Sequence, residues 1–74
     1  MDFGGAYMVE GTVLWFDDER GIGFIKTTSG DEIFVHHSSI DMEGFRSLSQ
    51  GDQVSFTVEE TSRGLEAKNV KEKV

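Results

Sequence analysis

Short runs of β-branched and aromatic residues, separated by glycine-containing turns, constrain the fold of this chain more than any other feature of its sequence. Over residues 53–59, for example, Val54, Phe56 and Val58 alternate with polar neighbours, which is the hydrophobic period of a half-buried strand. Strands are predicted at residues 9–16, 22–26, 32–37, 53–59 and 65–71. No stretch has the period of a long helix, so we expect an all-β fold, a small five-stranded antiparallel barrel.

The apolar residues that would face the inside of this barrel form its predicted core. They are Val9, Val13, Ile25, Ile33, Val35, Ile40, Leu48, Val54, Phe56, Val58 and Val70. A chain of 74 residues supports one core of this size and therefore one domain. The alternating pattern begins at Met8, so residues 8–74 are predicted to form the domain and residues 1–7 a flexible N-terminal extension or leader.

Composition excludes several classes of protein. The chain has no cysteine, which excludes a disulfide framework and a thiolate metal site. It has no apolar run long enough for a membrane helix and no signal-peptide pattern, so we expect a cytoplasmic location and no membrane partner. Its formal net charge of −7 argues against a partner held mainly by phosphate neutralisation. A nucleic acid would have to be bound chiefly by stacking, with a weak dependence on salt.

The chain has more large rings than so small a core can hold. Phe24 and Phe34 lie on strand faces opposite to those of Ile25 and Ile33, and neighbouring strands are about 4.8 Å apart, which predicts one exposed ring-bearing surface. Rings stack on bases and cations meet phosphates, so the predicted partner is single-stranded DNA or RNA. The predicted stacking residues are Trp15, Ile22, Phe24, Phe34, His36, His37 and Phe45, and the predicted polar contacts to phosphates or bases are Asp17, Arg20, Lys26, Arg46 and Arg63.

Catalytic and metal-binding interpretations have little support in the sequence. His36 and His37 are adjacent in a predicted strand and should point to opposite faces, so they are not expected to hold one ion together. Ser38 and Ser39 follow them, but neighbours in sequence do not make a catalytic triad. We therefore expect no enzymatic activity, no metal, no cofactor and no small-molecule substrate.

The ordered motifs of the chain resemble those of the cold-shock domain family between residues 8 and 70. The motif RGIGFI from Arg20 matches the first ribonucleoprotein motif, and FVHH from Phe34 corresponds to the second. The other motifs in family order are G-x-V-x-W-F from Gly11, GFRSL from Gly44 and A-x-N-V from Ala67. The resemblance implies an OB-type Greek-key barrel that binds single-stranded DNA and RNA with low sequence selectivity. It also implies a role as an RNA chaperone or in cold or stress adaptation.

The resemblance further implies roles for individual residues. The stacking positions of the family fall on Trp15, Phe24, Phe34, His36 and Phe45, and its phosphate or base contacts fall on Arg20 and Arg63. Five residues depart from what is usual in the family. Ile22 stands where an aromatic ring is usual, and His37 stands where Phe is usual. Leu14 replaces a usual Lys, Asp17 a usual Asn, and Leu65 a common Pro. Fewer rings and cations predict weaker binding than is usual in the family.

A second hypothesis treats the exposed rings as a protein interface rather than a base-binding surface. The connection over residues 38–51 is long enough to act as a hinge for strand exchange between two chains. The alternative is therefore a protein-interaction or strand-exchanged dimerisation module with weak nucleic-acid binding. The expected assembly is a monomer or a weak, strand-exchanged homodimer.

Overall fold

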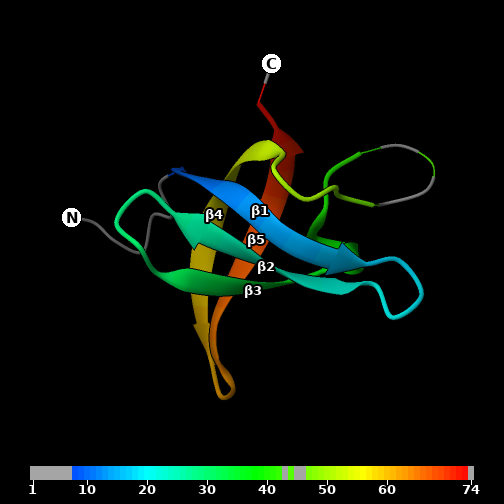
Figure 1. The fold of residues 1–74 in the computed structure, drawn as a ribbon. Helices are drawn as coiled ribbons and strands as arrows, with labels where there is room; N and C mark the ends of the chain where they lie inside the picture. The colour runs from blue at the N-terminus through cyan, green and yellow to red at the C-terminus, as the bar shows by residue number, and fades with distance from the viewer. Residues whose placement is uncertain (1–7, 43, 45–46, 74) are drawn as a thin grey trace.

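Five strands make up most of the computed structural model, which describes residues 8–42, 44 and 47–73 (Figure 1). The strands are β1 (Val9–Asp17), β2 (Ile22–Thr27), β3 (Glu32–His36), β4 (Gln53–Thr61) and β5 (Gly64–Glu72), and a short 3-10 helix, η1 (His37–Ser39), follows β3. The predicted strands agree with these bounds to within two residues at each end. No helix in the described ranges is long and apolar enough to cross a membrane. Residues 1–7, predicted to be a leader, lie outside the described residues.

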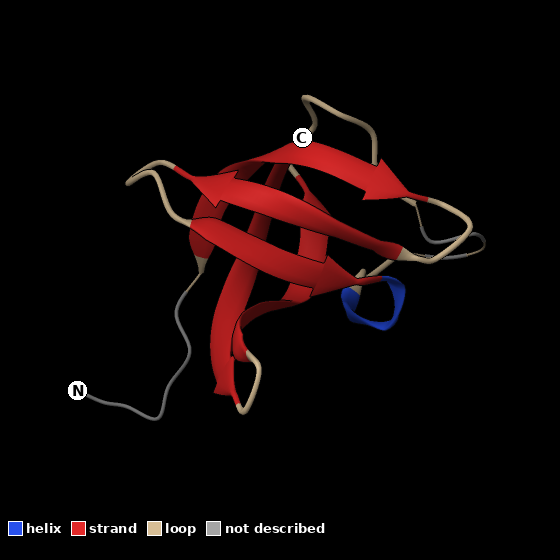
Figure 2. Cartoon of the chain, turned by 60° about the horizontal axis from the view of Figure 1, so that its bottom comes forward, coloured by secondary structure: helices blue, strands red, loops and turns tan. Residues whose placement is uncertain are grey.

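The strands close into a barrel in the order β1-β2-β3-β5-β4, with β4 paired back to β1. Figure 1 and Figure 2 show them wrapped around one interior. The predicted all-β, OB-type barrel is thus confirmed. The antiparallel prediction is wrong at one seam, because β3 and β5 run parallel and share the register pair Phe34 and Glu66. The reason is that the connection after η1 leads into the β4–β5 hairpin, whose second strand lies beside β3.

The core of the barrel is apolar. The buried residues are Val13, Ile25, Ile33, Val35, Ile40, Leu48, Val54, Phe56, Ala67 and Val70. Nine of the eleven predicted core residues are among them; Val9 and Val58 are only partly buried and pack against the core from its rim. Ala67, which was not among the predicted core residues, is 1% exposed and belongs to the core. Each large apolar side chain buried here contributes about 1.5–3 kcal/mol to folding.

An extra residue in β1 decides which way its large side chains point. Val13 pairs with Ile25 and Trp15 with Phe24, so Leu14 has no partner of its own in β2 and forms a β-bulge. Strict alternation would place Trp15 on the same face as Val13. The bulge separates them instead: Val13 is 1% exposed and Trp15 is 44% exposed. The sequence alone did not show this, because residues 13–16 are apolar throughout.

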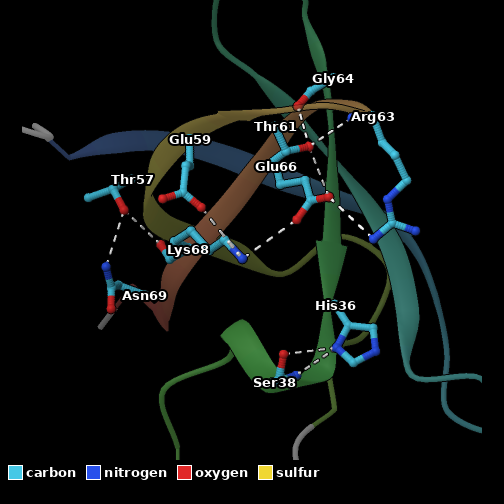
Figure 3. Close-up of polar contacts among 10 residues, drawn as sticks. All are labelled: His36, Ser38, Thr57, Glu59, Thr61, Arg63, Gly64, Glu66, Lys68 and Asn69. Carbon is cyan, nitrogen blue, oxygen red and sulfur yellow. Dashed lines mark hydrogen bonds and ion pairs between the residues drawn. The ribbon is translucent and has the colours of Figure 1, made fainter.

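A second irregularity lies in β5 at Asn69, where the register against β4 shifts between Ser55 and Thr57. Asn69 has φ of 55°, a left-handed conformation that Asn tolerates better than most residues. Its side-chain amide donates to the hydroxyl of Thr57 at 3.2 Å, and that hydroxyl donates to the carbonyl of Lys68 at 3.2 Å (Figure 3). The extra residue restarts the alternation of β5, so that the strand contributes inward side chains on both sides of the bulge.

Candidate functional site

Aromatic side chains from three neighbouring strands form one continuous surface. Trp15 pairs in register with Phe24, and Phe24 pairs with Phe34. The ring centroids of Trp15 and Phe24 are 5.6 Å apart at 48°, and those of Phe24 and Phe34 are 5.7 Å apart at 74°. Ile22 in β2 and His36 in β3 are also register partners, two residues away from Phe24 and Phe34. We call these five residues the aromatic surface.

The outward direction of these side chains follows from the alternation of β2 and β3. Ile25 and Val35 are buried, whereas their neighbours Phe24 and Phe34 are partly exposed. Gly23 precedes Phe24 in β2, and an added Cβ there would meet the carbonyl oxygen of Trp15. Only a hydrogen atom fits at this position, so the glycine lets β1 approach β2 closely beneath the rings.

His36 and His37 lie side by side, which corrects the sequence-based prediction that they point to opposite faces. Their ring centroids are 4.4 Å apart at 33°. The prediction failed because β3 ends at His36 and His37 begins η1, so the alternation of a strand no longer applies. The Nδ1 atom of His36 accepts from the backbone N–H of Ser38 at 3.2 Å and lies 2.9 Å from its hydroxyl (Figure 3). These contacts orient the imidazole at the end of the aromatic surface.

The turn between β1 and β2 supports His37 from the other side. The backbone N–H of His37 donates to the carbonyl of Gly21 at 2.7 Å. Gly21 has φ of +70°, and an added Cβ there would collide with the ring of His37. Glycine at this position therefore satisfies both the left-handed backbone and the close approach of the imidazole.

Three of the cations predicted to contact a nucleic acid lie among the described residues, in different settings. Lys26 is exposed two residues beyond Phe24 in β2 and therefore on the same face. Arg20 is exposed in the β1–β2 turn, 3.8 Å from the carboxylate of Asp17. Arg63 lies at the tip of the β4–β5 hairpin, which projects beyond β3 in Figure 1. The two remaining predicted contacts, Phe45 and Arg46, lie outside the described residues.

Asp17 has a structural function that the sequence-based list of polar contacts did not include. One of its carboxylate oxygens accepts from the backbone N–H groups of Glu19 at 3.0 Å and Arg20 at 3.3 Å. Its carbonyl accepts from the N–H of Gly21 at 2.7 Å. The side chain thus stabilises the turn that carries Arg20.

A pocket of about 300 Å³ adjoins the aromatic surface at the β3–β5 seam. Its walls combine the rings of two β-strands with polar and apolar groups from the β4–β5 hairpin; the lining residues are Phe24, Glu32, Phe34, Arg63, Leu65 and Glu66. The two rings and Arg63 are among the residues predicted from the sequence, whereas Glu32 and Glu66 are not. The sequence shows that Glu66 lies on a predicted strand, three residues after Arg63. It does not show that this strand pairs with β3 and brings Glu66 beside Phe34.

Glu66 is held in place by three side chains. Its carboxylate accepts from the hydroxyl of Thr61 at 3.3 Å and lies 3.7 Å from Arg63 and 3.5 Å from Lys68 (Figure 3). Lys68 also lies 3.8 Å from Glu59, the register partner of Glu66 in β4. Like charges directly opposite each other destabilise a sheet, so Lys68 offsets the repulsion between the two carboxylates.

Comparison with known proteins gives one consistent result. Residues 9–73 match the family described as the 'Cold-shock' DNA-binding domain. The cold shock protein CspC of Bacillus subtilis is 52% identical over 63 residues, which cover 85% of this chain and 96% of that protein. The major cold shock protein CspA of Bacillus cereus is 50% identical over 62 residues, 84% of this chain and 92% of that protein.

A solved structure supports the fold. Drosophila Unr CSD456 superimposes with a TM-score of 0.78 at 24% sequence identity. The match covers 95% of this chain but 28% of the larger one. At this identity the likeness shows that the two share a fold.

Proposed function

This chain belongs to the 'Cold-shock' DNA-binding domain family, and on that premise we propose that it binds single-stranded DNA and RNA with low overall sequence selectivity. Bases stack on the aromatic surface, and His37 extends that surface beyond His36. Arg20, Lys26 and Arg63 contact phosphates or bases. The proposal includes a cytoplasmic role in cold or stress adaptation, as an RNA chaperone or regulator, in which the protein binds its ligand without a chemical step.

The continuity of the aromatic surface carries this proposal. Trp15, Phe24 and Phe34 are register neighbours on three adjacent strands, with centroid separations of 5.6 and 5.7 Å. Successive bases of a single strand can stack on rings arranged in this way, and each stacked base contributes about 1–3 kcal/mol. A duplex keeps its bases paired and stacked on one another, so the surface favours unpaired strands.

The distribution of charge favours stacking over phosphate neutralisation. The chain carries a formal net charge of −7, and two of the cations proposed to contact the ligand, Arg20 and Arg63, already lie close to the carboxylates of Asp17 and Glu66. Few counterions are therefore released when a nucleic acid binds. A small release of counterions gives a shallow dependence of affinity on salt.

Titration with oligothymidine tests the proposed function. Trp15 is the only tryptophan and is 44% exposed, so a thymidine oligomer of about seven nucleotides should quench its fluorescence by stacking on it. We expect saturable quenching, with an affinity that falls by less than about tenfold between 50 and 200 mM salt. A duplex of the same length serves as the control and should bind far more weakly.

Two outcomes of this titration would contradict the proposal. One is the absence of quenching and of any binding heat at low salt. The other is a steep loss of affinity with salt and equal binding of the duplex, which would indicate phosphate neutralisation instead of stacking.

The isoleucine within the aromatic surface offers a gain-of-function test. Ile22 lies beside His36 on the face that carries Phe24, so Ile22→Phe should add a ring to this surface. We expect the affinity for oligothymidine to rise about five- to tenfold, the lower part of the range for one stacked base. Ile22→Leu is the matched control, because it keeps an apolar side chain without a ring. Equal affinities for the Phe and Leu variants would show that position 22 does not contact a base.

A further inference from the structure

The pocket at the β3–β5 seam differs in character from the rest of the aromatic surface. Phe24 and Phe34 provide ring walls, and Leu65, which is 46% exposed, provides an apolar rim. The polar part of the lining is mainly acidic, because Glu32 and Glu66 both reach it. Carboxylates repel phosphate, so this acidic wall does not serve the polyanionic backbone. It suits the hydrogen-bonding edge of a base whose ring lies against the phenylalanines.

Glu66 is the better placed of the two carboxylates for such a contact. It is the register partner of Phe34 in the parallel pair, so the two side chains lie on the same face of the sheet. The residue is 9% exposed, and Thr61 and Lys68 hold its carboxylate in place. Glu32 is exposed at the start of β3 and is therefore more fully hydrated. A fixed, partly desolvated acceptor discriminates between ligands more strongly than a mobile, hydrated one.

The carboxylate of Glu66 keeps hydrogen-bonding capacity for a ligand. An ionised carboxylate has about four lone-pair positions. The contacts that it makes are long: 3.3 Å from Thr61, 3.7 Å from Arg63 and 3.5 Å from Lys68. The Arg63 side chain is 82% exposed, so it can move from the carboxylate to a phosphate when a strand enters the pocket.

We propose that Glu66 makes this pocket selective for guanine, an inference that rests on the proposed single-strand binding. The Watson–Crick edge of guanine carries two adjacent donors, N1–H and the N2 amino group, which match the two oxygens of a carboxylate. Thymine and uracil present one N–H between two carbonyl oxygens, which the carboxylate repels. One position of the bound strand thus has a base preference, while the open part of the aromatic surface accepts any base.

Three oligonucleotides that differ at one nucleotide position test this proposal. They are a thymidine nonamer, the same strand with one central guanine, and the same strand with inosine in place of that guanine. Hypoxanthine, the base of inosine, lacks only the N2 amino group. We expect the guanine strand to bind about tenfold more tightly than either of the others, the effect of one bidentate base contact.

Variants then assign the preference to one side chain. In Glu66→Gln, the guanine and inosine strands should bind within about twofold of each other, since the amide has one acceptor oxygen in place of two. Glu59→Gln is the matched control. Glu59 is the register partner of Glu66 and also contacts Lys68, but it does not line the pocket, so this variant removes the same charge outside the site. This control should keep the tenfold ratio. Thermal melting confirms that both variants are folded.

The outcomes separate the inference from the function on which it rests. Equal binding of all three strands by the unmodified protein would overturn guanine selection and leave single-strand binding intact. The inference would also be overturned if Glu66→Gln bound every strand more tightly by the same factor and kept the ratio between the guanine and inosine strands. Glu66 would then act only by repelling phosphate. Failure of all three strands to bind would instead contradict the proposed function and, with it, the inference.

Discussion

Replacing Phe24 with alanine should weaken the binding of oligothymidine by about tenfold or more, because stacking of one base contributes about 1–3 kcal/mol. Phe24 is the ring with a neighbour on both sides, Trp15 at 5.6 Å and Phe34 at 5.7 Å. Its loss interrupts the aromatic surface in the middle and also removes a wall of the pocket. Calorimetric titration is the appropriate measurement, since Trp15 lies against the altered side chain and its fluorescence would change for that reason alone.

Two further substitutions at this position separate stacking from simple apolar contact. Phe24→Tyr keeps the ring and should keep most of the affinity, whereas Phe24→Leu keeps apolar volume and should lose most of it. Because Phe24 is only partly buried, all three variants should remain folded at 25 °C, which a thermal melt verifies. Wild-type affinity in the alanine variant would mean that bases do not stack on this surface.

Gly23→Ala should be among the most destabilising single-methyl additions in the protein. The new methyl group would meet the carbonyl oxygen of Trp15 and lie 2.8 Å from Cδ1 and 3.0 Å from Cα of Phe16. Two of these three atoms belong to the backbone of β1, so relief requires the strands to separate. Overpacking of this kind costs about 1–3 kcal/mol, and each kcal/mol lowers the Tm of a domain of this size by about 4–8 °C. We expect a fall of about 10 °C.

The matched control for this prediction is Gly30→Ala in the β2–β3 turn. An added Cβ there has nothing within 4 Å, so only the strain of a residue at φ of +100° remains. Thermal unfolding followed by circular dichroism should show the larger loss for Gly23→Ala. If the two variants had the same Tm, the close approach of β1 and β2 would not be the reason for glycine at position 23. The Gly23 variant should also bind oligothymidine less well, since the carbonyl that moves belongs to Trp15.

The alternation of apolar and polar residues was enough to predict most of the fold. It placed Ile33 and Val35 inside the barrel and Phe34 and His36 on the outer face, as the structure confirms. A period of two residues is a local property of a strand and needs no knowledge of its partners. The same reasoning placed Phe24 opposite Ile25, and so assembled much of the candidate site before any strand order was known.

What the sequence did not show depends on pairing between strands. Trp15 was predicted to lie on the exposed surface, but the bulge at Leu14 that turns it outward exists only relative to β2 and was not predicted. The positions of His37 and Glu66 depend on where β3 ends and on which strand lies beside it. Because the pocket is built across a parallel seam between strands distant in sequence, no local pattern marks its acidic wall. Strand exchange through the connection at residues 38–51 stays a prediction. Light scattering tests it, because it measures the mass of the assembly in solution.

The seam between β3 and β5 has a consequence for the energetics of binding. These strands share a single register pair, Phe34 and Glu66, supplemented by the bridge between Ile40 and Val70. The pocket lies over this seam and takes its walls from both sides of it. A base held there would join the two edges of the barrel where the backbone ladder is shortest. Binding of a base in the pocket would therefore be thermodynamically linked to closure of the barrel. A change that loosens the seam should then lower affinity even when every residue that lines the pocket is intact.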